Sequence, residues 1–182
     1  MSYTRWMSRS VIALFIAALA AAPAGAVTVA PLSFEQLIQA SSAVVYGRVT
    51  SVRAQWSEDR RHVESVVTVE VLKGLKGSAP EAMSFTVPGG QLGRYVNVIP
   101  GAPAFSEGDL AVVFLTARGP RLPVTTGFTQ GIYRVQRGRT GELLVQPPVV
   151  TTGRIVRGDA DRKPVPLAAF ESSVRAIASA AR

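Results

Sequence analysis

The residues able to do chemistry in this sequence are few, and they begin with a single histidine. The 182-residue chain contains one histidine, His62, and no cysteine. A serine-hydrolase triad would place His62 beside a serine nucleophile and an orienting carboxylate. The candidates for these roles are Ser65, Ser106 and Asp109. Since no G-x-S-x-G motif is present, we expect His62 to be an exposed strand residue and the chain to have no catalytic residues.

Paired carboxylates, which suit acid–base catalysis, occur only in predicted turns. Acidic side chains are frequent in turns because they accept hydrogen bonds from nearby backbone N–H groups. The absence of cysteine excludes thiol catalysis and thiolate metal sites. We therefore expect no metal and no other cofactor, although Asp159 and Asp161 could offer two oxygen ligands to a hard cation. The pairs are Glu58 with Asp59, Glu107 with Asp109, and Asp159 with Asp161.

A glycine-rich stretch at residues 88–95 is the most distinctive local motif. It matches neither the dinucleotide-binding fingerprint nor the phosphate-binding loop, and no helix start follows it. Two interpretations remain open. The glycines could form a turn that needs positive φ angles, or they could present side chains to a partner. The candidate binding residues are Gly89, Gly90, Gly93, Arg94 and Tyr95. If this loop is only a scaffold, we expect the interaction site among the arginines of residues 134–139 or 154–162.

The first 26 residues have the pattern of a secretory signal peptide. Arg5 and Arg9 precede a twelve-residue apolar run, and the Ala-Gly-Ala sequence at residues 24–26 matches the cleavage motif. A membrane-spanning helix needs about 20 apolar residues, so this run is too short to be a typical anchor. We expect cleavage between Ala26 and Val27, and a periplasmic or extracellular protein with one domain over residues 27–182.

The charge balance is basic, with 20 Lys and Arg against 12 Asp and Glu. Removal of Arg5 and Arg9 with the signal peptide leaves 18 basic residues and a net charge of +6. A basic exported protein is attracted to anionic envelope polymers and to acidic protein surfaces, but the same charge also fits a surface that keeps the protein soluble. Export separates the chain from cellular nucleic acid. We therefore expect no nucleic acid on the basic aromatic face that Tyr46, Arg48, Arg53 and Trp56 could form.

Hydrophobic periodicity predicts a mainly β fold. Residues 43–56 and 62–72 are predicted strands, joined into a hairpin by a polar turn at residues 57–60, and Gly47 suggests a bulge or a close backbone approach. Valines alternate along the second strand, so its odd-numbered face is expected to be buried. Residues 110–115 are expected to be the central buried strand. Further strands are predicted at 82–87, 131–136 and 142–146, loops or turns at 73–77, 120–123 and 137–141, and an irregular connector at 153–166.

A helix is predicted near each end of the domain. Ser33 and Gln36 have the spacing of a capping box, and Leu32 and Leu37 that of a hydrophobic staple, which predicts a helix over residues 34–40. Residues 167–180 form an amphipathic pattern with Leu167, Phe170, Val174 and Ile177 on one face. The polar face of this second helix is not strongly basic, so we expect it to pack on the sheet rather than on a membrane.

The order of these motifs resembles that of a family of exported bacterial proteins of unassigned function, over residues 32–146. The V-x-G-x-V pattern of the first strand and the Lys73-Gly74 end of the second are also similar to netrin-like modules, which include the tissue inhibitors of metalloproteinases. That similarity implies an OB-type antiparallel barrel, and we expect either such a barrel or a rolled sheet. The inhibitors bind zinc through an amino-terminal cysteine, which this chain lacks, so their inhibitory residues do not carry over. The segments concerned are Val44-Val45-Tyr46-Gly47-Arg48-Val49, Thr68-Val69-Glu70-Val71-Leu72-Lys73-Gly74, Pro88-Gly89-Gly90, Gly108-Asp109 before Val112-Val113-Phe114-Leu115, and Gln130-Gly131-Ile132-Tyr133-Arg134-Val135.

These observations favour an exported, non-catalytic β-barrel module that binds a protein or an envelope component. An inhibitor-like partner of an exported protease is the second hypothesis, and a hydrolase of unknown type is the third. The sequence leaves open the identity of the partner, the oligomeric state and the role of the glycine-rich loop.

Overall fold

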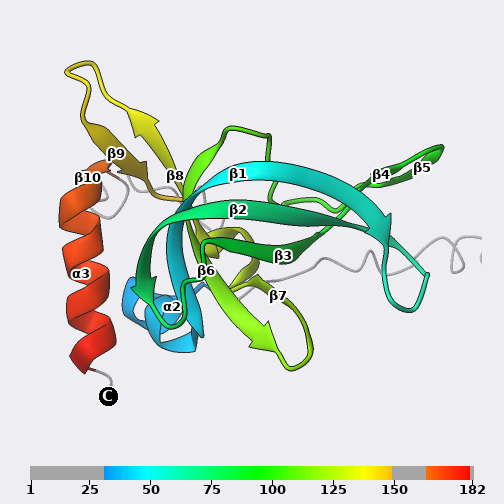
Figure 1. Ribbon diagram of the computed structural model, residues 1–182, viewed down its shortest axis with the longest axis horizontal. Helices are drawn as coiled ribbons and strands as arrows, with labels where there is room; N and C mark the ends of the chain where they lie inside the picture. The colour runs from blue at the N-terminus through cyan, green and yellow to red at the C-terminus, as the bar shows by residue number, and fades with distance from the viewer. Residues whose placement is uncertain (1–30, 149–162, 181–182) are drawn as a thin grey trace, which may run out of the picture.

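The computed structural model describes residues 31–148 and 163–180 of the protein. The predicted signal peptide and its cleavage site, the Asp159/Asp161 pair and the arginines of residues 154–162 lie outside the described residues. The described part is mainly β, with a short helix near its start and a longer helix at its end (Figure 1). The prediction of a mainly β fold with a short first helix and a longer last helix is therefore confirmed.

The described part contains ten strands, two α-helices and one 3-10 turn. The helices are α2 (Phe34–Ala40) and α3 (Leu167–Ala180), and the 3-10 turn η1 covers Phe128–Gly131. The strands are β1 (Ala43–Trp56), β2 (Val63–Lys76), β3 (Ala82–Pro88), β4 (Gly90–Leu92), β5 (Tyr95–Asn97), β6 (Leu110–Arg118), β7 (Arg121–Thr125), β8 (Ile132–Arg137), β9 (Leu143–Gln146) and β10 (Val165–Pro166).

Five strands form a ring in the order β1-β2-β3-β7-β6, which is completed because β6 also pairs with β1. Neighbours in the ring are antiparallel except β3 and β7, which run parallel and meet at a single pair, Thr86 with Val124. Strands β8, β9 and β10 extend the sheet from β6, and β4 and β5 form a separate hairpin. Strand β6 has partners on both edges, as its continuous apolar run predicts.

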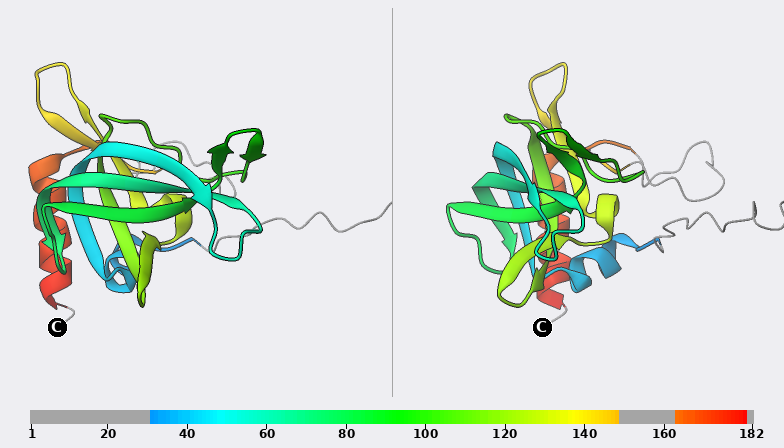
Figure 2. Two further views of the ribbon diagram at one scale, coloured as in Figure 1. Left: turned by 45° about the vertical axis from the view of Figure 1, so that its right-hand side comes forward. Right: turned by 90° about the vertical axis from the view of Figure 1, so that its right-hand side faces the viewer.

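The start of β1 (residues 43–47) and the middle of β6 (residues 111–115) are buried on both faces. Successive side chains point to opposite sides of a strand, so each of these segments contributes to two cores. Val45 and Val113 point to the inside of the ring, where they pack with Val67 and Phe85. The residues before and after Val45 and Val113 point outward and belong to a second core. This core also includes residues of α2 and α3, and these two helices lie against the outside of the ring (Figures 1 and 2). The second core contains Leu37, Ile38, Val44, Tyr46, Val112, Phe114, Leu167, Phe170 and Val174.

The two helices begin and pack as the sequence predicts. The Ser33 hydroxyl accepts a hydrogen bond from the Gln36 N–H at 3.1 Å, and the Gln36 side chain accepts one from the Ser33 N–H at 2.9 Å. This capping box satisfies backbone donors that a helix start leaves open. In α3, Phe170 and Val174 are buried against the sheet. Neither of these helices is long and apolar enough to cross a bilayer, and the same holds for the rest of the described chain.

Two loop predictions are wrong, and the predicted irregular connector at residues 153–166, which lies outside the described residues up to residue 162, is wrong at its end, where Val165–Pro166 form β10. Residues 73–77 were expected to be a loop, but β2 continues to Lys76 because Gly74 and Lys76 pair with β1. The length of β2 is therefore set by its long partner rather than by its local glycines. Residues 120–123 were expected to be a turn, but the turn ends at Pro120 and β7 starts at Arg121. Pro123 is tolerated in β7 because it lies where the register with β6 shifts, so no ladder bond is lost.

Candidate binding surface

The glycine-rich loop folds as the β4–β5 hairpin, which projects from the ring (Figure 1). Gly89, Gly90 and Gly93 all have positive φ, at 90°, 145° and 59°. A Cβ atom at Gly90 would lie 2.6 Å from the Ser65 Oγ, which is closer than real Cβ atoms approach a neighbour. The prediction of a turn that needs positive φ is therefore confirmed, and it leaves open whether the hairpin also binds a partner.

The base of the hairpin is tied to β2 by three hydrogen bonds. The Ser65 hydroxyl donates to the Gly89 carbonyl at 2.8 Å. The Asn97 side-chain amide donates to the Val63 carbonyl at 2.9 Å, and the Gly89 N–H donates to the same carbonyl at 3.2 Å. These bonds fix the position of the hairpin on the ring, so side chains farther along it project in a defined direction.

An aromatic pair joins the hairpin to the end of β1. The rings of Trp56 and Tyr95 meet edge to face with their centroids 5.0 Å apart. The Arg94 guanidinium carbon lies 5.2 Å from the Tyr95 ring centroid, and Arg94 also donates to the Tyr95 hydroxyl at 3.1 Å. The structure thus brings together two residues of the predicted binding loop. It adds Trp56, which the sequence analysis had considered only for nucleic acid.

Exposed apolar side chains gather around this aromatic pair. Seven large apolar side chains are exposed in the described part of the chain, and five of them lie at this end of the molecule. They are Trp56 (38% exposed), Tyr95 (47%), Val96 (61%), Val98 (77%) and Leu122 (40%). We call this region the distal end and define it as residues 53–64, 90–98 and 118–122.

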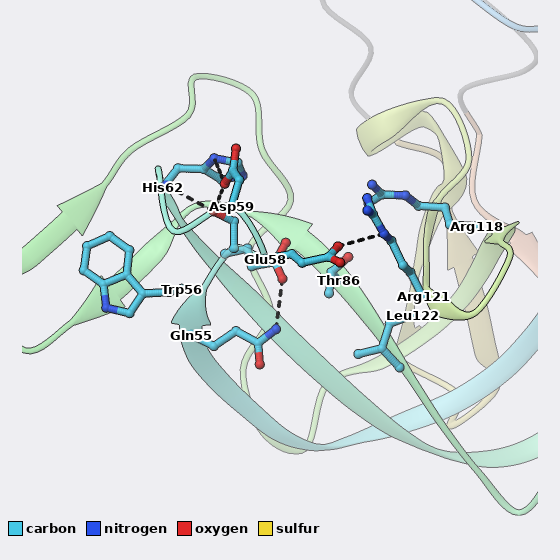
Figure 3. A pocket seen from close by; sticks show the side chains of 11 residues that line it. Gln55, Trp56, Glu58, Asp59, His62, Thr86, Arg118, Arg121 and Leu122 are labelled. Carbon is cyan, nitrogen blue, oxygen red and sulfur yellow. Dashed lines mark hydrogen bonds and ion pairs between the residues drawn. The ribbon is translucent and has the colours of Figure 1, made fainter.

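A hollow of about 590 Å³ lies beside the aromatic pair, between the β1–β2 turn and the β6–β7 hairpin (Figure 3). The Arg121 guanidinium binds the Glu58 carboxylate at 2.8 Å and bridges the two hairpins. Trp56 lies on the opposite side of the turn from Arg118 and Arg121 (Figure 3). The lining combines charged, aromatic and aliphatic side chains, which suits recognition of a ligand with both polar and apolar groups.

An apolar groove of about 330 Å³ lies on the other side of the hairpin, where its lining includes Val52, Val87, Val96, Val98 and Phe105. Its wall is the segment between β5 and β6, which Arg134 holds in place. The Arg134 guanidinium binds the Asp109 carboxylate at 2.6 Å and the Ala104 carbonyl, and lies 4.7 Å from the Phe105 ring centroid. Arg134 is one of the arginines of residues 134–139, which the sequence analysis named as an alternative interaction site. Its contacts give it a structural role.

The candidate catalytic residues do not assemble into a triad. The Ser65 hydroxyl is buried and donates to the Gly89 carbonyl, and the Asp109 carboxylate binds Arg134. A serine, an aspartate and the histidine do meet in the β1–β2 turn. There the Ser57 hydroxyl donates to Asp59 Oδ1 at 2.6 Å, and His62 Nδ1 lies 3.8 Å from the same oxygen.

In this turn the carboxylate lies between the hydroxyl and the imidazole, so His62 is not placed to accept the serine proton. The hydrogen bond from Ser57 lowers the pKa of Asp59, and the Arg61 N–H adds to the effect. Sequence reasoning missed this contact because it depends on the exact turn geometry. The arrangement stabilises the turn that directly follows Trp56.

The basic aromatic face considered from the sequence is not formed as a whole. Tyr46 is 7% exposed and belongs to the core beneath the helices, where burial raises the pKa of its hydroxyl. The Arg48 guanidinium lies 3.9 Å from the Glu70 carboxylate. Arg53 and Trp56 remain exposed at the distal end.

Comparisons with known proteins assign neither a family nor a function to this chain. No family model matches the chain, and neither a curated protein nor a solved structure matches it. Among residues 31–148 and 163–180, no group of three or more histidine, aspartate and glutamate side chains gathers as a metal site.

Proposed function

We propose that the protein is an exported, non-catalytic module that binds a protein or another component of the cell envelope through its distal end. The observation that carries this proposal is the gathering of five of the seven exposed large apolar side chains at that end. Scattered apolar residues are normal on a surface, whereas a cluster with polar neighbours is typical of an interaction site. The aromatic and arginine side chains within it are the types most enriched at binding hot spots.

An OB-type barrel is our proposal for the fold family. The support is the ring of five strands with one weakly joined pair, β3 and β7, since OB folds are partly open five-stranded barrels. Such barrels bind ligands over their second and third strands, between the loop that joins strands one and two and the loop that joins strands four and five. The hollow occupies the corresponding place, between the β1–β2 turn and the β6–β7 hairpin.

Capture of partners from an envelope extract tests the proposed function. The double variant Arg94→Ala/Tyr95→Ala should stay folded with at most a small loss in melting temperature, because both side chains are exposed and only the surface contact with Trp56 is lost, and it should lose most of the captured partner. Leu72→Ala is the matched control, since Leu72 is also an exposed apolar residue (41%) but lies outside the distal end. Equal capture by all three proteins would contradict the proposal.

Further outcomes of the same work separate the competing hypotheses. A protease as the main captured partner would favour the inhibitor-like role. Hydrolytic turnover that is lost in the His62→Ala variant would favour an enzyme and contradict the proposal. Amino-terminal sequencing of the protein from the envelope fraction tests export, for which we expect Val27 as the first residue; an intact Met1 in a membrane pellet would favour an uncleaved anchor.

A further inference from the structure

The β4–β5 hairpin exposes apolar side chains on both of its faces. Tyr95 packs on Trp56 on one face, and Val96 points the opposite way because side chains alternate along a strand. Val96 and Val98 are 61% and 77% exposed, the two highest values among the exposed large apolar side chains of the described residues. A folded protein partner would need a groove that closes around both faces. A lipid headgroup layer surrounds a projecting element without such a fit.

The aromatic pair beside the tip of the hairpin consists of side chains typical of a membrane–water interface. Tryptophan and tyrosine are enriched at that depth because each ring has an apolar body and a polar group. Here the Tyr95 hydroxyl accepts a hydrogen bond from Arg94, which lies in the turn at the tip of the hairpin. The arrangement lets the rings reach the headgroup layer while the guanidinium stays beside the lipid phosphates.

The charge of the distal end is complementary to an anionic surface. Within the residues that define it there are six arginines and three carboxylates, a net charge of +3 with His62 neutral. One of these arginines, Arg121, is paired with Glu58. The other five have no carboxylate within ion-pair distance in the described part of the chain, and they are Arg53, Arg60, Arg61, Arg94 and Arg118.

We propose that the distal end docks on the surface of an anionic lipid bilayer, with Val96, Val98 and the Trp56–Tyr95 pair entering the headgroup layer. The five arginines without a carboxylate partner supply the positive charge that attracts the distal end to the lipid phosphates. This proposal rests on the proposed function and names the envelope component as lipid. Docking of this kind is reversible and interfacial, because its strength comes from a small apolar area together with electrostatic attraction.

Cosedimentation with lipid vesicles tests the docking. The protein is purified after export and its amino terminus is sequenced, so that no remaining signal peptide contributes to binding. We expect at least about tenfold tighter binding to vesicles that contain phosphatidylglycerol than to pure phosphatidylcholine vesicles, because each arginine near an anionic surface adds to the attraction. Added salt should weaken the binding, since it screens exposed charges. The same affinity for both lipids, or no binding to either, would overturn the proposal.

A matched pair of variants assigns the binding to the hairpin. Val96→Asp/Val98→Asp should lower the affinity for the anionic vesicles by at least about tenfold, because it replaces apolar contacts with negative charges that the anionic lipids repel. Leu72→Asp/Val165→Asp adds the same two charges at exposed positions outside the distal end and should bind within about twofold of the wild type. Thermal melts check that both variants fold. If the two variants bind equally, the hairpin is not the docking element.

The outcomes distinguish this proposal from the proposed function. If vesicles do not bind but Arg94→Ala/Tyr95→Ala loses an envelope protein in the capture experiment, the lipid proposal fails and the proposed function stands. If vesicles do not bind and that variant captures the same partners as the wild type, both fail.

Discussion

Val66 and Val67 are adjacent residues of β2 that point to opposite faces of the sheet. Val67 is 0% exposed and packs inside the ring of strands, whereas Val66 is only half-buried. The same truncation to alanine at both positions therefore tests whether the odd-numbered side chains of β2 point into the ring and the even-numbered ones away from it. Because both residues are valines in one strand, the loss of intrinsic strand preference is similar and cancels in the comparison.

The expected cost of Val67→Ala follows from its burial. Removing two buried methyl groups costs about 1.6 kcal/mol, at about 0.8 kcal/mol for each. The cavity left in a packed core adds about 1 kcal/mol, which gives a total of about 2.5 kcal/mol in the free energy of unfolding. Val66→Ala should cost about 1 kcal/mol or less, because its side chain already meets water in the folded state.

Urea denaturation followed by circular dichroism measures both free energies under the same conditions. We expect the difference between the two variants to be about 1.5 kcal/mol, with Val67→Ala the less stable. Equal losses, or a larger loss for Val66→Ala, would refute the assignment of the odd-numbered face to the inside of the ring.

Three further predictions concern other parts of the fold. Gly90→Val should destabilise the protein by more than about 1 kcal/mol, because β-branched residues are disfavoured at positive φ and a Cβ there would meet Ser65, and an unchanged melting temperature would contradict this. Lys73→Ala should cost about 1–3 kcal/mol in chemical denaturation, because it removes the partner of the buried Glu171 carboxylate, and adding Glu171→Gln should restore part of that loss. For Asp59 the pKa is lower in the folded than in the unfolded state, so its stabilisation of the β1–β2 turn is present above the usual aspartate pKa and is lost as the pH falls through the lowered one. In an NMR titration we expect Ser57→Ala to raise the pKa of Asp59, and an unchanged midpoint would show that the hydroxyl is not the cause.

Local patterns predicted much of the fold. The helix α2 and the strand β1 begin and end where the sequence analysis placed them, because capping and alternation act between residues close in the chain. Gly47 was predicted at a bulge or close approach. It lies at a register shift, and a Cβ there would be 2.6 Å from the Glu70 carbonyl oxygen. These features depend on a few neighbouring side chains or on one backbone conformation.

Features that depend on contacts between distant parts of the chain were not predicted. The extension of β2 to Lys76 is imposed by its pairing with β1. The contact between Trp56 and Tyr95 joins the end of β1 to a hairpin that follows β3, so no local sequence pattern predicts it. The candidate binding residues Arg94 and Tyr95 were named from the loop, but their setting in an apolar distal end follows only from the ring of strands.

We propose that the protein meets its partner through the distal end. Site-specific photo-crosslinking in intact envelopes tests it, with the photoreactive group placed at Val98 in one protein and at Leu72 in another, both of which are exposed apolar positions. We expect adducts, to lipid or to protein, from position 98 and few from position 72. Adducts of equal yield from both positions, or adducts from position 72 alone, would contradict the claim.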